Sequence, residues 1–389
     1  MGVPARLLAM LAVAAATHAQ GAVAAAADRF VPTDPGFVVA SIRQTQPDAE
    51  LLPVIEAWRA ERSASATAAL SAAYIERARS RREPAYFGRA EAVLAPLATK
   101  PGAAADLRRL FAEVLQFRHD FSGAETLLGG VLNEQPHDAN ARLLRASVRL
   151  VRGDFEGARA DCAQLAAAGG DAAVPGFACF AEALAGGGSL ERGLAMLSLP
   201  AHPRSLRPAE SAYLLATRAE LRERARDTAG AIEDYQVALG LAPNDDSIRA
   251  AYADALASLG MKEEARATLT VDKASVALLV RSAALAEGTQ RAALVARADS
   301  WLALEAARGD ALHFREAAML ALVNGETARA LAAAQANFEN QRELPDVRVL
   351  ARAAQAARNP QALSALRQWL HDTGYRDSVT ESIVDAALR

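Results

Sequence analysis

Large aromatic side chains are scarce in this chain: they make up 5% of its 389 residues, although hydrophobic residues reach 52%. A β protein would need more aromatic and β-branched residues, and so high a hydrophobic content excludes a wholly disordered chain. Much of that content is alanine, the best helix former, which also lets helices approach one another closely. The composition therefore predicts thin layers of packed helices rather than one thick core.

The chain also has little net charge and no recognisable catalytic motif. The formal charge is −3, and the chain lacks the basic stripe that is typical of nucleic-acid-binding proteins. It has no His-Glu-x-x-His motif and no Asp-rich calcium loop. The glycine-rich stretch at 186–193 lacks the Lys and Ser/Thr of a phosphate loop, so we expect a turn between helices there. The sequence predicts no enzyme activity, no metal, no cofactor and no nucleic-acid partner.

The first residues resemble a secretory signal peptide. Arg6 supplies a positive charge, residues 7–16 form an apolar stretch, and small residues then allow cleavage after Ala19 or Ala24. The apolar stretch is too short to span a membrane as a stable helix. We therefore expect an exported protein without a membrane span, in the periplasm or secreted. An alanine-rich tail or an uncleaved anchor is the alternative.

Small residues, mostly alanine, recur about every 34 residues inside a fixed frame of larger apolar residues. Frames counted back from Pro136 and Pro243 start at 105 and 212, and three further frames begin near 139, 174 and 246. The small residues should lie where the two helices of a repeat touch, because only a small side chain fits there. The clearest copy, 212–245, carries Leu215, Ala219, Ala231, Tyr235, Ala238 and Pro243.

Four arginines occupy positions where this frame favours apolar residues, namely Arg142, Arg145, Arg218 and Arg249. Two explanations are open for them. Either the helices are shifted by one residue, or the arginine stems lie along apolar surface while their charges stay in water.

The pattern resembles the tetratricopeptide repeat. The resemblance implies an all-α fold, an α-solenoid of helix-turn-helix repeats wound into a right-handed superhelix. We expect a signal peptide at 1–19, an extended arm and capping helix at 20–63, the repeat array at 64–272, and degenerate helical repeats with a C-terminal cap at 273–389. The arm either packs on the solenoid or reaches a partner.

Tetratricopeptide arrays hold a partner segment in a concave groove lined by the first helix of each repeat. Acids stand where a carboxylate-binding clamp would have asparagines, and the matching lysines are missing, so a neutral or basic segment fits better. By resemblance, the groove residues are Arg109, Glu113, Gln116, Phe117, Ser147, Glu182, Tyr213, Glu220, Glu223, Arg224 and Asp254.

Cys162 and Cys179 are the only cysteines. They fall on the second helix of one repeat and the first helix of the next, which pack together. Two alternatives are open: a disulfide, as an oxidising compartment would favour, or two buried thiols that act as small apolar groups. A redox site is not expected, because the Cys-x-x-Cys spacing is absent.

The sequence thus predicts a non-catalytic scaffold or adaptor that binds a protein partner in its groove; it does not name the partner. A structural subunit that self-assembles through the faces of the solenoid is the first alternative. A regulator with unrecognised chemistry in 273–389 is the second.

Overall fold

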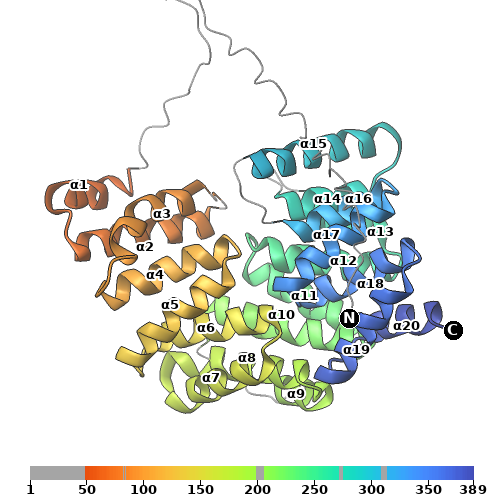
Figure 1. Cartoon of the computed structure of the whole chain (residues 1–389), viewed down its shortest axis with the longest axis horizontal. Helices are drawn as coiled ribbons and strands as arrows, with labels where there is room; N and C mark the ends of the chain where they lie inside the picture. Colours follow the sequence, from red (N-terminus) through yellow and green to blue (C-terminus); the bar gives the residue numbers. More distant parts are fainter. Residues whose placement is uncertain (1–48, 82, 84, 199–205, 271–274, 308–312) are drawn as a thin grey trace, which may run out of the picture. The chain divides into compact units, whose positions relative to one another are not determined.

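The structure is a computed structural model, and it describes residues 49–81, 83, 85–198, 206–270, 275–307 and 313–389. The expected signal peptide and almost all of the extended arm lie outside these residues. Within them, the regular elements are twenty α-helices and one 3-10 turn, with no strand (Figure 1). The prediction of an all-α solenoid is confirmed.

The helices follow one another as antiparallel neighbours. After α1 (Leu52–Glu61), the successive pairs are α2 (Ala64–Ser80) with α3 (Ala85–Ala98), α4 (Ala105–Phe117) with α5 (Phe121–Glu134), α6 (Ala139–Arg152) with α7 (Phe155–Ala168), α8 (Ala173–Gly186) with α9 (Leu190–Ser198), α10 (Pro208–Arg224) with α11 (Thr228–Leu241), α12 (Asp246–Ser258) with α13 (Lys262–Leu269), α14 (Val276–Leu285) with α15 (Gly288–Ala307), α16 (Phe314–Val323) with α17 (Thr327–Asn340), and α18 (Leu344–Ala356) with α19 (Pro360–Thr373). A last helix, α20 (Ser378–Ala387), packs on α18 and α19. The first helices of the expected repeats begin at 105, 139, 173, 208 and 246, at or close to the expected starts.

Small residues stand where paired helices cross, as the repeat frame predicts. Each member of the following pairs is at most 1% exposed: Ala112 with Ala124, Ala146 with Ala158, Ala219 with Ala231, Ala253 with Ala265, and Ala318 with Ala330. Between α8 and α9 the crossing is closer still. A Cβ on Gly193 would lie 2.4 Å from the carbonyl oxygen of Ala181. Only a residue without a Cβ fits that crossing without a backbone shift.

The four out-of-frame arginines have a different explanation from the two that the sequence suggested. Arg145 binds the buried Asp161 carboxylate on α7 with two hydrogen bonds of 2.6 and 2.8 Å, and Arg218 binds Asp234 on α11 in the same way. Arg249 donates to the carbonyl oxygen of Pro243 at 2.6 Å. Arg142 donates to the carbonyl oxygen of Pro136, the proline at the equivalent position of another repeat. These helices are not shifted. Arg145 and Arg218 pair with an acid inside their repeat, whereas Arg142 and Arg249 bind the carbonyl of the proline that ends the preceding repeat.

Cys162 on α7 and Cys179 on α8 are joined by a disulfide, with their Cα atoms 5.6 Å apart. That separation lies within the normal range for disulfides. Both residues are buried in one hydrophobic cluster with Ala146, Ala158 and Ala183. The bond therefore ties two successive repeats together at their shared apolar contact.

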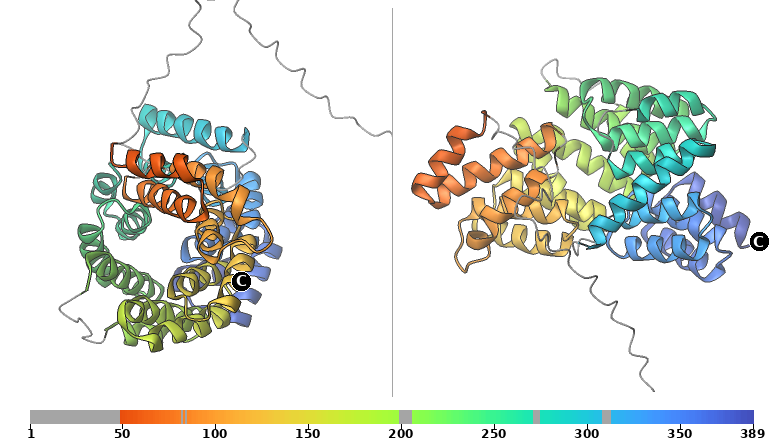
Figure 2. Two further views of the ribbon diagram at one scale, coloured as in Figure 1. Left: turned by 90° about the vertical axis from the view of Figure 1, so that its left-hand side faces the viewer. Right: turned by 90° about the horizontal axis from the view of Figure 1, so that it is seen from above.

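The stack of helices curves until its C-terminal part returns to its middle. In Figures 1 and 2 the helices α17–α20 lie beside α6–α10. The contact includes a backbone hydrogen bond of 2.7 Å from the Arg342 amide to the carbonyl of Val151. It also includes a close approach of the Gly188 and Gly374 backbones. Arg152 and Arg342, which are 190 positions apart, are thereby brought together.

Replacement of Gly193 by alanine should destabilise the protein by about 2 kcal/mol, because the new methyl group would force the α8–α9 crossing apart. A methyl group added to Gly129, which also lies inside a helix, would meet no atom within 4 Å. Gly129→Ala should therefore stabilise the protein by about 0.5–1 kcal/mol through helix propensity. Urea unfolding of the two variants measures both effects. Equal effects of the two substitutions would contradict the proposed tight crossing.

Reduction of the disulfide should lower the free energy of unfolding by about 3 kcal/mol, as expected for closure of a loop of this length. Urea unfolding with and without dithiothreitol measures the loss. The Cys162→Ala, Cys179→Ala double variant should not respond to the reductant. Two reactive thiols in the denatured but unreduced protein would show that the cysteines are unpaired.

Candidate partner-binding surface

The groove residues on α4 and α6 form two polar contacts and one exposed aromatic site. Arg109 lies 3.4 Å from Glu113, a residue that is also 3.2 Å from Arg79 on α2. Gln116 donates a 3.3 Å hydrogen bond to the Ser147 hydroxyl and so links α4 to α6. The structure therefore brings these four predicted groove residues together in two pairs.

Phe117, at the end of α4, keeps 37% of its surface exposed. Its ring stacks on that of the buried Phe87 from α3, with centroids 3.9 Å apart and planes 10° apart. The buried Phe87 ring thus holds the exposed Phe117 ring in place. The exposed face could receive an apolar side chain of a partner without any further ordering of Phe117.

Glu182 on α8 and Glu220 on α10 form the acidic centre of the predicted groove. Both side chains are half-buried, and neither makes an ion pair with a residue that the structure describes. The Tyr213 hydroxyl, on α10, interacts with Glu182 from the neighbouring helix. Two carboxylates with little water and no ion pair among the described residues make an electrostatically costly arrangement, which a directly paired cation would relieve.

The pKa values reflect this cost. Burial, followed by the charges of Glu220 and Glu343, raises the pKa of Glu182 to about 8. Burial also raises the pKa of Glu220 to about 7; Arg224 opposes this rise, while Glu343 and Glu223 add to it. Both carboxyl groups therefore exchange protons near neutral pH rather than near their ordinary value.

Glu223 and Arg224, the next groove residues on α10, are 5% and 2% exposed. Glu223 accepts hydrogen bonds from the Tyr235 hydroxyl at 3.0 Å and from Arg348 on α18 at 2.7 Å. Arg224 donates to the Arg376 carbonyl at 2.9 Å, and its guanidinium carbon lies 3.9 Å from the centre of the Tyr375 ring. The C-terminal helices of the chain itself therefore cover this part of the predicted groove.

Asp254, the last predicted groove residue, lies on α12 and keeps 41% of its side chain exposed. It pairs with Arg281 on α14 at 2.8 Å. Among the described residues, no group of three His, Cys, Asp or Glu side chains is placed to hold a metal ion. None of the described helices combines the length and apolarity needed to cross a bilayer.

Sequence reasoning did not identify the residues that the C-terminal helices bring to this surface. Arg348 also binds the fully buried Asp377 at 2.9 Å, and Asp377 in turn caps the N-terminus of α20. The Tyr375 hydroxyl is buried without a hydrogen-bond partner among the described residues. No local pattern marks these residues, because they reach α10 only through the curvature of the whole stack.

Comparison with known protein families finds no match. Comparison with curated proteins finds none either. Comparison with solved structures returns tetratricopeptide repeat proteins. A tetratricopeptide repeat protein of Thermus thermophilus is 23% identical, with a TM-score of 0.38 over 51% of this chain and 99% of the other. One from Parabacteroides merdae is 12% identical, with a TM-score of 0.31 over 73% and 99%. The assignment of the fold rests on the helix pairs and small-residue contacts of this chain.

The acidic centre should make stability depend on pH. A carboxyl group whose pKa is higher in the folded than in the unfolded protein stabilises the fold at low pH, and this stabilisation is lost as pH rises through the folded pKa. From about pH 6 to about pH 9 the free energy of unfolding should therefore fall by about 2 kcal/mol more in the wild type than in the Glu182→Gln, Glu220→Gln variant. Urea unfolding across this range measures the difference. Parallel curves would show that these groups titrate normally.

Proposed function

We propose that the chain is a non-catalytic interaction scaffold that binds a neutral or basic segment of a partner protein on the concave face of α4–α12. The observation that carries the proposal is the acidic centre formed by Glu182 and Glu220. These carboxylates lie half-buried on the first helices of successive pairs and have no ion pair among the described residues. A lysine or arginine side chain would supply the missing positive charge.

The rest of the predicted groove supports an extended contact. Phe117 offers an exposed ring that is already held in place by Phe87. Ser147 offers a polar group between that ring and the acidic centre along the chain, and Gln116, its hydrogen-bond partner, directly precedes the ring. Repeats present such side chains on a preformed helical frame, so that a partner segment loses entropy but the scaffold loses little.

The proposed place of action is the periplasm. The signal-like order of Arg6, the apolar stretch at 7–16 and Ala19 supports export. The pairing of Cys162 with Cys179 suits an oxidising compartment, where disulfides persist. A function in the assembly or maturation of envelope or secreted proteins fits both features.

Loss of the acidic centre should weaken partner capture. We expect Glu182→Gln with Glu220→Gln to reduce the amount of partner crosslinked in the native envelope by about tenfold, since a desolvated charge pair is lost. Mass spectrometry of the crosslinked product identifies and quantifies the partner. The matched control is Glu156→Gln with Glu233→Gln, which changes two exposed acids on the second helices α7 and α11.

Equal capture by both double variants would count against the concave face as the binding surface. Sizing of the purified protein separates the main alternative. A stable homo-oligomer with no crosslinked partner would favour a structural subunit that assembles through the faces of the solenoid.

A further inference from the structure

The contact between the C-terminal helices and the middle of the stack is mainly polar. We call α17–α20 the C-terminal block, together with the loops that join them. The block holds α6 and α10 through hydrogen bonds and charge pairs rather than through a shared apolar layer. These bonds are Arg342 N to Val151 O at 2.7 Å, Arg342 Nη1 to Arg152 O at 2.8 Å, Arg224 Nε to Arg376 O at 2.9 Å, and Arg348 Nη1 to Glu223 Oε2 at 2.7 Å.

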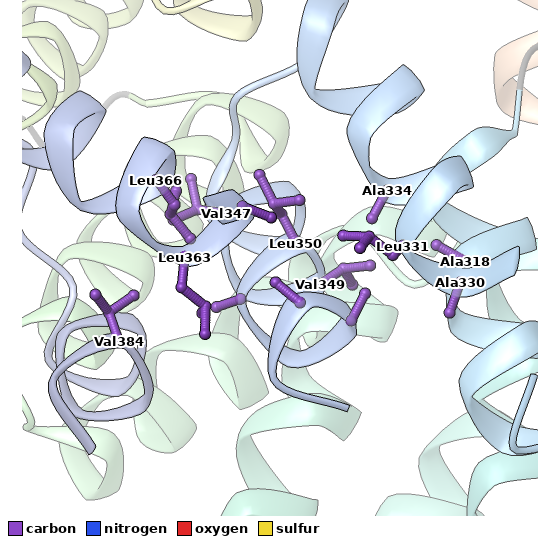
Figure 3. Packing of buried hydrophobic residues seen from close by; sticks show 14 of the residues in the cluster. Ala318, Ala330, Leu331, Ala334, Val347, Val349, Leu350, Leu363, Leu366 and Val384 are labelled. Atoms are coloured by element: carbon purple, nitrogen blue, oxygen red, sulfur yellow. The ribbon is translucent and has the colours of Figure 1, made fainter. Parts of the chain in front are cut away.

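The block and the neighbouring α16 share a hydrophobic core. Figure 3 shows Val347 of α18 toward Leu363 and Leu366 of α19, and Val349 on the side of α18 toward Leu331 of α17; residues of α16 and α20 complete the cluster. Among the described residues, Phe155 is the one apolar side chain from outside α16–α20 that packs against this core. The core would therefore survive separation of the block from α6–α10. Polar interfaces between self-sufficient cores are typical of parts that move relative to each other.

The block occupies predicted groove residues in the manner of a ligand. Arg348 places a guanidinium on Glu223, and the loop at 375–376 covers Arg224. Glu182 and Glu220 lie on α8 and α10 and have no ion pair among the described residues, so the block satisfies only part of the acidic surface. A segment with more than one positive charge could satisfy the rest as well.

We propose that the C-terminal block is an internal occupant of the concave face, and that a partner segment carrying arginine displaces it by taking the Glu223 carboxylate from Arg348. This inference rests on the proposed function and states how that function is regulated. The free protein is closed by its own C-terminal helices. Binding opens the contact between α10 and the block while both helical cores stay folded.

The decisive variant removes the Arg348 guanidinium, which occupies the concave face, and keeps the Glu223 carboxylate that binds it. Arg348→Gln with Asp377→Asn removes the guanidinium without leaving Asp377 charged and unpaired, and asparagine still caps α20. The probe is a hexa-arginine peptide with blocked ends. We expect backbone amides in α10 and α18 to exchange with deuterium about tenfold faster, and the peptide to bind about tenfold more tightly, than in the wild type. Addition of Glu223→Gln should abolish the gain in affinity.

The matched control breaks an equivalent ion pair between α16 and α18. Arg315 on α16 binds Asp346 on α18 at 2.9 Å, and Asp346, like Asp377, is buried. Arg315→Gln with Asp346→Asn should leave hydrogen exchange in α10 unchanged. Unchanged exchange in the Arg348 variant, or faster exchange without tighter peptide binding, would overturn the inference. Neither result bears on partner capture through Glu182 and Glu220, which tests the proposed function separately.

Discussion

The close crossing of paired helices is the contact on which the whole structure depends. Alanine or glycine stands at each crossing in the repeats from α4 to α13, and Gly193 shows how little room remains there. Close crossings let a chain with few large side chains bury a continuous apolar layer, because each repeat packs on both of its neighbours. The thin layer also explains why polar contacts are needed at the junctions. Arg142 and Arg249 supply them by donating to the carbonyl oxygens of Pro136 and Pro243.

The same geometry determines where charge can accumulate. First helices follow one another along the concave face, so acids at equivalent positions of α8 and α10 come together, as Glu182 and Glu220 do. Their mutual repulsion is not relieved by an ion pair among the described residues. Desolvation then raises the pKa of each carboxyl group. The half-buried carboxylates raise the free energy of the unbound protein. A cationic partner would bind there favourably, because its charge would relieve their repulsion.

The contact between the C-terminal helices and the middle of the stack is a second feature that organises the fold. The C-terminal block shares a core with α16 and approaches α6–α10 mainly through polar groups. A rigid array and a separable block can thus coexist in one chain. The rigid part presents the surface, and the separable part competes for it. This arrangement gives the proposed scaffold a way to distinguish partners by their positive charge.

The sequence by itself determined the all-α solenoid, the start positions of most repeats and the two helices that carry the cysteines. Contacts within a repeat join residues about twelve positions apart, such as Ala219 and Ala231, so a local pattern records them. It could not assign the out-of-frame arginines, because their partners Asp161 and Asp234 look like ordinary surface acids in the sequence. Only the tertiary structure decided that Arg348 would meet Glu223, 125 positions away. That meeting depends on the small rotation added by every repeat in between, and no single repeat encodes their sum.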